Sequence, residues 1–227
     1  CLVFGASGVI GSEVVTRFES HGYEVWRASR SAKTGSVQNL VAVGDTEVDS
    51  HAMKSWPEFD AVVWAQGSNV NDSIINFSSQ VFDEVLNANI KFVASTLASL
   101  LRNEKILAGA RLCIVSSIWQ DAIRPDKLSY SVSKAALNGL LKSVALDLSE
   151  KKIFVNAILP GVLDTSMTRS VLSDDQIKTV QRRTGFNRLV LPDDLSALIY
   201  FLCSDSNTCV TGQSVVADLG FSNVRPL

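Results

Sequence analysis

Three polar residues in one stretch of the chain have the types and the spacing of a proton-transfer site. Tyr130 follows Ser117 by 13 residues, and Lys134 follows Tyr130 by four. If residues 130–149 form a helix, as their pattern predicts, Tyr130 and Lys134 lie one turn apart on the same face. A phenol loses its proton only near pH ~10, but a neighbouring ammonium favours the phenolate and moves that pKa towards neutrality. The spacing therefore indicates a tyrosine that exchanges a proton with a substrate.

The segment that could bind a second reactant lies at the start of the chain. Residues 1–4 are an apolar run that predicts a strand, and residues 5–11 follow as Gly-Ala-Ser-Gly-Val-Ile-Gly. Apolar residues then recur at helical spacing over 9–20. In a strand–glycine turn–helix unit the backbone can approach a pyrophosphate closely, and the helix N-terminus attracts its charge. The alternative interpretation is a tight strand-to-helix turn without a ligand.

Strand and helix patterns alternate along the chain. The expected strands lie near 1–4, 23–27, 39–43, 60–64, 111–116, 153–158 and 214–218, and the expected helices near 9–20, 80–101, 130–149 and 193–203. This alternation predicts an α/β fold, a Rossmann-like doubly wound parallel β-sheet flanked by helices on both faces. With 227 residues, 46% hydrophobic composition and no shift in composition, we expect a single domain over 1–227.

The composition argues against several classes of function. A net charge of −2, with no run of Lys or Arg longer than two, gives no reason to expect nucleic acid. No apolar stretch approaches the ~20 residues that a membrane span needs. The two histidines and four cysteines have no metal-ligand grouping, so we expect no metal, and free thiols in a cytoplasmic protein. The chain begins inside its first expected strand without a methionine, so we expect N-terminal residues to be missing.

Together and in this order, these motifs resemble the short-chain dehydrogenase/reductase family over nearly the whole chain. Further segments similar to the family are 64–67, 86–90, 112–117, 155–165 and 211–218. Three places depart from the family's usual sequence. The glycine turn is spaced Gly-x-x-Gly-x-x-Gly instead of Gly-x-x-x-Gly-x-Gly, Trp-Ala-Gln-Gly at 64–67 replaces Asn-Asn-Ala-Gly, and Asp-Leu-Gly at 218–220 replaces Asp-Gly-Gly.

The resemblance implies an enzyme that interconverts a carbonyl and a secondary alcohol by hydride transfer, with a nicotinamide cofactor. Ser117 would hold the substrate oxygen, Tyr130 would exchange the proton, and Lys134 would lower the tyrosine pKa and bind the ribose. Asn89 would hold a water that links Lys134 to solvent. The substrate pocket would involve 68–72, 119–120 and 165–188. The candidate cofactor-binding residues are Gly5, Ser7, Gly8, Val9, Ile10, Gly11, Ser29, Arg30, Asp45, Ala65, Gln66, Gly67, Tyr130, Lys134, Pro160, Gly161, Val162 and Thr165.

The end of the second expected strand discriminates between the two nicotinamide cofactors. An acidic residue there binds the ribose 2′-hydroxyl of NAD, whereas an arginine accommodates the 2′-phosphate of NADP. Ser29 and Arg30 occupy this place and no carboxylate does, which favours NADP(H), with NAD(H) as the alternative. In the interpretation without a ligand, Arg27 and Arg30 lie on a solvated loop. Asp45 is the candidate for an adenine contact, and Asp49 competes with it.

Two other functions are weighed against the oxidoreductase. A catalytically idle NADP-binding sensor or scaffold module is favoured by the unusual glycine spacing and by Trp-Ala-Gln-Gly at 64–67. It is opposed by the intact set Asn89, Ser117, Tyr130 and Lys134. An isomerase or epimerase that uses bound cofactor transiently is opposed by the short chain, which has no room for a separate substrate domain.

The helix expected over 130–150 also bears on the partners of the chain. It is apolar on more than one side, so one side can cover the sheet while another contacts a second copy. Members of the family commonly associate through this helix and the one that contains Asn89. The resemblance therefore implies a homodimer or homotetramer, with a small-molecule carbonyl or alcohol as substrate and neither nucleic acid nor membrane as partner.

Overall fold

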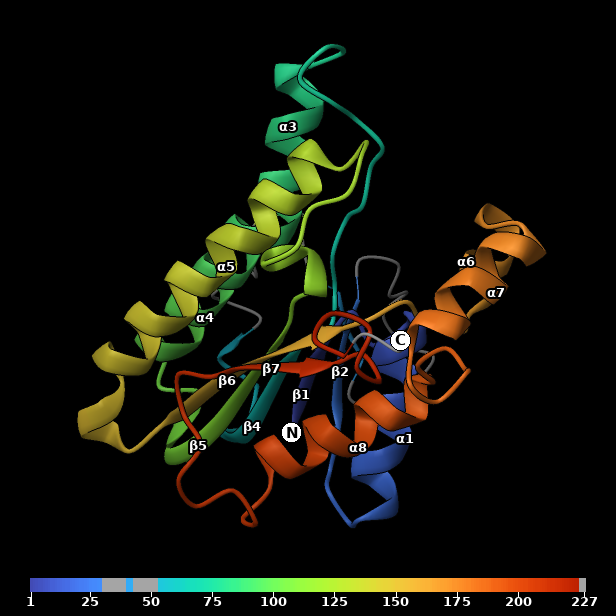
Figure 1. The fold of residues 1–227 in the computed structure, drawn as a ribbon. Helices are drawn as coiled ribbons and strands as arrows, with labels where there is room; N and C mark the ends of the chain where they lie inside the picture. Colours follow the sequence, from blue (N-terminus) through green and yellow to red (C-terminus); the bar gives the residue numbers. More distant parts are fainter. Residues whose placement is uncertain (30–39, 43–52, 225–227) are drawn as a thin grey trace.

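The computed structural model describes residues 1–29, 40–42 and 53–224. Within them, seven strands form one parallel sheet in the order β3-β2-β1-β4-β5-β6-β7 (Figure 1). The strands are β1 (Leu2–Phe4), β2 (Trp26–Ser29), β3 (Leu40–Ala42), β4 (Phe59–Trp64), β5 (Ile106–Val115), β6 (Phe154–Pro160) and β7 (Ser214–Ala217). The strand order reverses at β1, and a doubly wound sheet binds ligands beyond the carboxyl ends of its strands at such a reversal. The predicted fold class is confirmed.

Two layers of helices cover the sheet because successive strand residues point to opposite faces. On one face, Phe4 and Trp64 join the apolar core beneath α4 (Phe92–Arg102) and α5 (Leu128–Asp147). On the other face, Val3 and Val63 join the core beneath α1 (Val9–Ser20) and α8 (Pro192–Cys203). Figure 1 shows these two pairs of helices on opposite sides of the strands.

The start of β2 differs from its prediction. The expected strand at 23–27 begins only at Trp26, because the backbone N–H of Tyr23 still donates to the Phe18 carbonyl at the end of α1. Pairing with the neighbouring strand starts when the Trp26 N–H donates to the Cys1 carbonyl. The strand runs through Ser29, which therefore lies at its carboxyl end.

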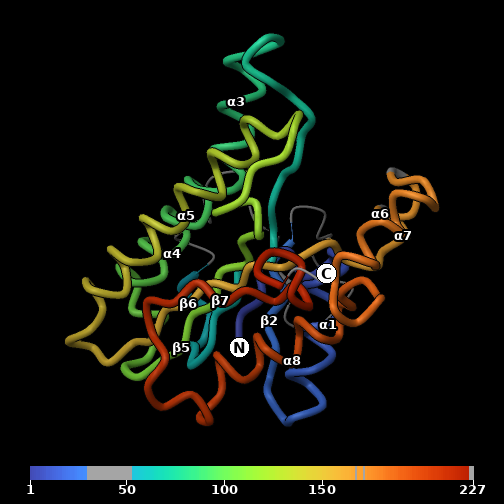
Figure 2. Tube along the Cα trace, viewed as in Figure 1, coloured from blue at the N-terminus to red at the C-terminus, as the bar shows by residue number. Residues whose placement is uncertain are grey.

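The helix predicted at 80–101 consists of three segments. It begins as α3 (Ser79–Leu86), passes through a π-helical turn η1 (Asn87–Lys91), and continues as α4. A π-turn inserts extra backbone into a helix and so changes the direction in which its side chains point. As Figure 2 shows, this continuous segment carries α3 out beyond the sheet.

Two helices that the sequence analysis missed follow β6. They are α6 (Ser166–Val171) and α7 (Asp174–Arg183), which lie on the other side of the carboxyl ends from α3 (Figure 2). The shorter turns are the 3-10 helices η2 (Ile118–Gln120) and η3 (Ser149–Lys151). In the part of the chain that is described, no helix is long and apolar enough to cross a membrane.

Candidate active site

The structure brings Ser117, Tyr130 and Lys134 together beyond the end of β5. Ser117 follows this strand with an extended backbone, and Tyr130 and Lys134 lie in the first two turns of α5. The Lys134 Nζ atom donates to the Val115 carbonyl at 3.0 Å and lies 5.6 Å from the centroid of the Tyr130 ring. The Ser117 side chain lies close enough to the phenol of Tyr130 to lower its pKa. The three residue types that the spacing singled out therefore share one place.

Burial controls the protonation of this group. Lys134 is 4% exposed, and the loss of hydration lowers its pKa to about 8. Burial also raises the pKa of Tyr130, and the Ser117 side chain opposes this only in part. The direction for Tyr130 is the reverse of the lowered pKa expected from the tyrosine–lysine spacing, because desolvation penalises the phenolate as it penalises the ammonium. That expectation is corrected for the protein without ligands.

Asn89 lies in the π-turn with its side chain buried against the loop that follows β4. Its Oδ1 atom accepts from the Ser68 N–H at 2.7 Å, and its Nδ2 atom donates to the Ser68 carbonyl at 2.9 Å and to Ser133 Oγ at 2.8 Å. A methyl group on Gly67 would lie 3.1 Å from Asn89 Oδ1 and 3.6 Å from Lys134 Nζ. Asn89 thus fixes the start of this loop close to Lys134, while its predicted role in holding a water stays a prediction.

The glycine turn requires glycine at two positions. Gly5 has a φ of +74°, and a methyl group there would lie 2.7 Å from the Gln66 backbone nitrogen. A methyl group on Gly11 would lie only 2.1 Å from the Gly5 carbonyl oxygen. Gly8 is the N-cap of α1 and forms no side-chain cap, and Val9 and Ile10 begin the helix. The turn therefore presents a bare helix N-terminus, which suits a phosphate group.

An unpaired amide lies beside this turn. Both polar atoms of the Gln66 side chain are buried and have no hydrogen-bond partner. A buried polar group without a partner costs free energy, so a ligand that hydrogen-bonds it would be favoured. The closely packed glycines let a ligand approach the backbone, and the Gln66 amide offers it an unsatisfied polar group. Both features fit a dinucleotide.

The other predicted cofactor residues lie in three described places, and some fall outside the described residues. Ser7 Oγ lies 3.0 Å from Ser29 Oγ, so the glycine turn and the end of β2 are in contact. After β6, the Gly161 N–H donates to the Ala217 carbonyl at 3.0 Å. Pro160, Gly161 and Val162 thus lie next to β7, and Thr165 caps α6. Ala65 donates its N–H to the Phe4 carbonyl, which holds it beside the glycine turn. Arg30, Asp45 and Asp49 lie outside the described residues.

Arg27, which the interpretation without a ligand placed on a solvated loop, lies within β2 and has a partner. Its guanidinium forms an ion pair with Glu19 on α1. This pairing supports the interpretation of Arg27 as a structural surface residue. The candidate phosphate contact at this edge of the sheet therefore rests on Arg30.

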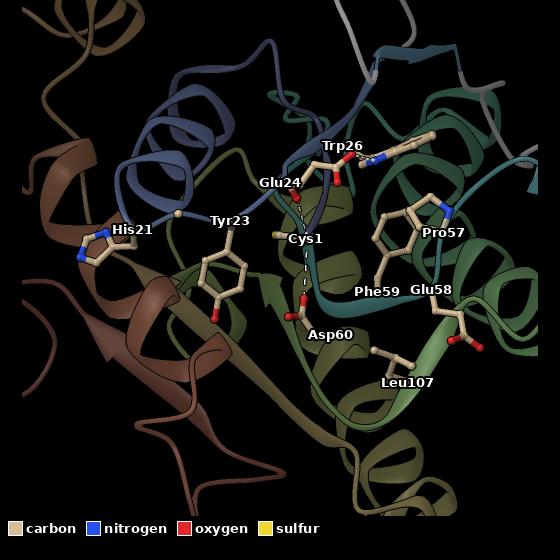
Figure 3. Close-up of a pocket in the computed structure, with 11 residues that line it drawn as sticks. Cys1, His21, Tyr23, Glu24, Trp26, Pro57, Glu58, Phe59, Asp60 and Leu107 are labelled. Carbon is tan, nitrogen blue, oxygen red and sulfur yellow. Dashed lines mark hydrogen bonds and ion pairs between the residues drawn. The ribbon is translucent and has the colours of Figure 1, made fainter.

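A hollow of about 390 Å³ lies at the amino ends of the strands, opposite the carboxyl ends that carry the catalytic candidates (Figure 3). Its walls come from residues at or before the starts of β1, β2, β4 and β5, whereas the catalytic candidates lie at the carboxyl ends. Cys1, Glu24 and Asp60 are among the residues that line it. Among the described residues, no group of His, Cys, Asp and Glu is placed to hold a metal ion.

Comparison with known proteins gives concordant matches. A family model described as enoyl-(acyl carrier protein) reductase matches residues 5–222. The human dehydrogenase/reductase SDR family member 4 is 33% identical over 149 residues, which are 65% of this chain and 54% of that protein. The chain thus spans about half the length of this curated relative. The L-rhamnose 1-dehydrogenase (NADP(+)) of Thermoplasma acidophilum is 28% identical over 221 residues, covering 92% of this chain and 86% of that protein.

A solved structure agrees over almost its whole length. The short-chain dehydrogenase family protein from Francisella tularensis superimposes with a TM-score of 0.87 at 25% identity, covering 97% of each chain.

Proposed function

Because this chain belongs to the short-chain dehydrogenase/reductase family, we propose that it is an NADP(H)-dependent oxidoreductase that interconverts a carbonyl and a secondary alcohol. The observation that carries the proposal is the meeting of Ser117, Tyr130 and Lys134 beyond the end of β5. The end of a strand and the start of a helix bring these side chains together. A hydroxyl, a phenol and an ammonium are what a proton transfer to a carbonyl oxygen needs.

Each residue has a separate role in this proposal. The bound nicotinamide supplies or accepts the hydride. Ser117 holds the substrate oxygen by a hydrogen bond, and Tyr130 donates its proton to that oxygen or takes one from it. Lys134 favours the phenolate through its charge and binds the ribose hydroxyls. Asn89 keeps the loop after β4 against the site through its bonds to Ser68.

The cofactor would lie across the carboxyl ends of β1, β4 and β6. The proposed contacts are the glycine turn with the α1 N-terminus for the pyrophosphate, the Gln66 amide for a polar group nearby, and the Pro160–Thr165 segment for the nicotinamide half. We propose NADP(H) over NAD(H) because Ser29 and Arg30 follow one another at the end of β2 without a carboxylate. A relative whose name specifies NADP(+) supports this choice.

Turnover of NADPH by the purified protein over a broad panel of carbonyl compounds tests the function. Tyr130→Phe removes the proton donor and should lower turnover by ~10² to 10⁴ while NADPH still binds, as measured by its fluorescence. Tyr23→Phe is the matched control, because Tyr23 lines the hollow at the amino ends of the strands. Full turnover in Tyr130→Phe would contradict the assignment of the acid.

The same binding assay distinguishes the remaining alternatives. Tighter binding of NADPH than of NADH, lost in Arg30→Ala, is expected if the arginine holds the 2′-phosphate. Tight NADPH binding without turnover of any compound would favour the catalytically idle sensor. The cytoplasmic location of the protein stays a prediction.

We also propose that the protein forms a homodimer or homotetramer through the outer side of α5. Leu137 and Leu141 on the inner side of this helix are buried against the sheet, as the two-sided apolar pattern predicted. The outer side exposes Val132, Ala136 and Leu146 to solvent. Apolar side chains gathered on an exposed helix favour contact with another apolar surface.

A further inference from the structure

Lys127 is a buried lysine that the proposed mechanism does not use. It is 8% exposed and is the N-cap residue of α5, three positions before Tyr130. Its Nζ atom donates to Asn69 Oδ1 at 2.7 Å, to the Val70 carbonyl at 3.0 Å and to Asn71 Oδ1 at 2.6 Å. An ammonium has three donors, so these three bonds use all of them. Lys127 is therefore fixed by oxygens that carry no charge of their own.

This fixed ammonium lies close to the proposed proton donor. Lys127 Nζ is 5.9 Å from the centroid of the Tyr130 ring, and Lys134 Nζ is 5.6 Å from the same centroid. Two lysine nitrogens thus lie at nearly equal distances from the Tyr130 ring. The spacing of Tyr130 and Lys134 does not reveal the second of them, that of Lys127. A positive charge held beside the ring favours the phenolate over the neutral phenol.

The loop that holds Lys127, residues 68–72, is itself attached at both ends. Asn89 binds Ser68 at its start. At its end, Asp72 Oδ1 accepts from the Ser129 N–H at 3.0 Å, and the Asp72 carbonyl accepts from the Leu128 N–H at 3.2 Å. The ammonium is therefore held in place before a substrate arrives, and fixed charges act most strongly on a reacting group when they need not reorganise.

We propose, on the basis of the function proposed above, that Lys127 is a second positioning cation for Tyr130, which acts with Lys134 to set the pH range of proton exchange. Loop 68–72 holds the ammonium at the ring, so the loop and the acidity of the phenol are coupled through one side chain. Loss of the Lys127 charge should therefore change the chemistry of Tyr130, and not only the order of the loop.

The other charged groups near this pair act mainly on Lys127. Burial lowers the pKa of Lys127 and Arg124 lowers it further, whereas Asp72 and Asp126 raise it. Ser117 is uncharged, and its side chain lowers the pKa of the phenol. On α3 and η1, which pack against α5, the charged residues are exposed: Asp83, Glu84 and Lys91.

Titration of the phenol by ultraviolet difference absorbance tests the proposal without a substrate. The full chain, saturated with NADP⁺, is titrated towards alkaline pH, and the signal of Tyr130 is obtained by subtracting that of Tyr130→Phe. Lys127→Gln removes the charge but keeps a hydrogen-bond donor, and should raise the tyrosine pKa by about one unit. Lys127→Arg should restore most of the shift, and Lys142→Met, an exposed position on the same helix, should leave the titration unchanged.

A separate variant distinguishes charge from loop order. Asn71→Ala removes one contact of the loop and keeps the ammonium, so it should move the titration much less than Lys127→Gln. An unchanged titration in Lys127→Gln, or an equal shift in Asn71→Ala, would overturn the proposal even if turnover falls. If Lys127→Gln shifts the titration of Tyr130 but the wild-type protein turns over no carbonyl, the proposed function is overturned. Lys127 then remains a cation that acts on this phenol. Thermal unfolding of each variant confirms that the compared proteins are folded.

Discussion

Lys134 illustrates how burial and catalysis oppose one another in a single residue. Its ammonium must leave water to reach the Val115 carbonyl and the Tyr130 ring, and within the described residues it donates one hydrogen bond, to that carbonyl. The resulting pKa of about 8 means that near neutrality the folded protein carries a charge that its environment disfavours. Strongly shifted pKa values are typical of functional sites, and under the proposed function Lys134 keeps its place at the expense of stability.

The stability of the ligand-free protein should therefore rise with pH in a way that depends on Lys134. Between pH 8 and the unfolded value near ~10.4, the unfolded chain binds more protons at this site than the folded chain, so the free energy of unfolding increases with pH. The raised pKa of Tyr130 acts in the opposite direction only above pH ~10. Lys134→Met should lack this rise and should be more stable near neutrality by roughly 1–3 kcal/mol.

Denaturant unfolding of wild type, Lys134→Met and the exposed control Lys142→Met, each near neutrality and at about pH 9.5, measures the effect. Parallel pH dependence in wild type and Lys134→Met would show that the buried ammonium does not control stability.

At the scale of single residues, the sequence predicts which residues meet but not their protonation. The positions of Ser117, Tyr130 and Lys134 follow from strand and helix patterns that fix their directions. The burial that raises one pKa and lowers the other depends on packing from distant segments, which periodicity does not reveal. The environments of Lys127 and Gln66 could not be predicted from the sequence for the same reason. Only tertiary contacts show that the Lys127 ammonium is fully hydrogen-bonded and that the Gln66 amide has no partner.

The start of α5 is an element whose stability comes from elsewhere in the chain. Its N-cap residue, Lys127, provides no side-chain cap, and its first turn contains no acidic residue. Asp72 replaces that cap from the loop after β4, because its carboxylate accepts from both the backbone N–H and the hydroxyl of Ser129. A carboxylate at a helix N-terminus also interacts favourably with the helix dipole.

Asp72→Ala should therefore destabilise the protein by about 1–3 kcal/mol and loosen the turn that presents Tyr130. Asp83→Ala on the exposed side of α3 is the control and should change stability little. Chemical denaturation gives the free energy, and hydrogen exchange at residues 128–131 locates the loss. Equal stability of the two variants would mean that α5 does not depend on this long-range cap.

The helices were predicted correctly where the periodic apolar pattern is long, and they were missed where it is short. The helices α1, α5 and α8 were predicted nearly at their observed bounds because each carries several turns of periodic apolar residues. The short α6 and α7 were missed, although Ser173 and Gln176 form a capping box that could have indicated α7. The π-turn has no sequence signature of this kind, and the contacts of Asn89 with the loop after β4 are visible only in the folded chain.

At the scale of the whole molecule, the alternation of side chains along the strands explains how both faces of the sheet are covered by helices. It does not explain the composition of the outer surface of α5. Gly139 lies in the middle of this helix, where glycine costs roughly 1 kcal/mol relative to alanine. A methyl group on Gly139 would meet nothing within 4 Å in the protomer. Nothing in the described protomer therefore requires the glycine, but a second helix packed closely across this surface would.

Gly139→Arg should accordingly leave the protomer folded and convert the proposed dimer or tetramer to monomers. The added side chain enters open space in one copy, but it would place a bulky charge inside an apolar contact between two copies, and burying an unpaired charge is costly. Light scattering coupled to size exclusion gives the mass, and thermal unfolding reports the fold. Gly185→Arg is the matched control, because a methyl group there also meets nothing within 4 Å. A Gly139→Arg protein with the mass of wild type would place the contact elsewhere, and a monomeric wild type would exclude it at the tested concentration.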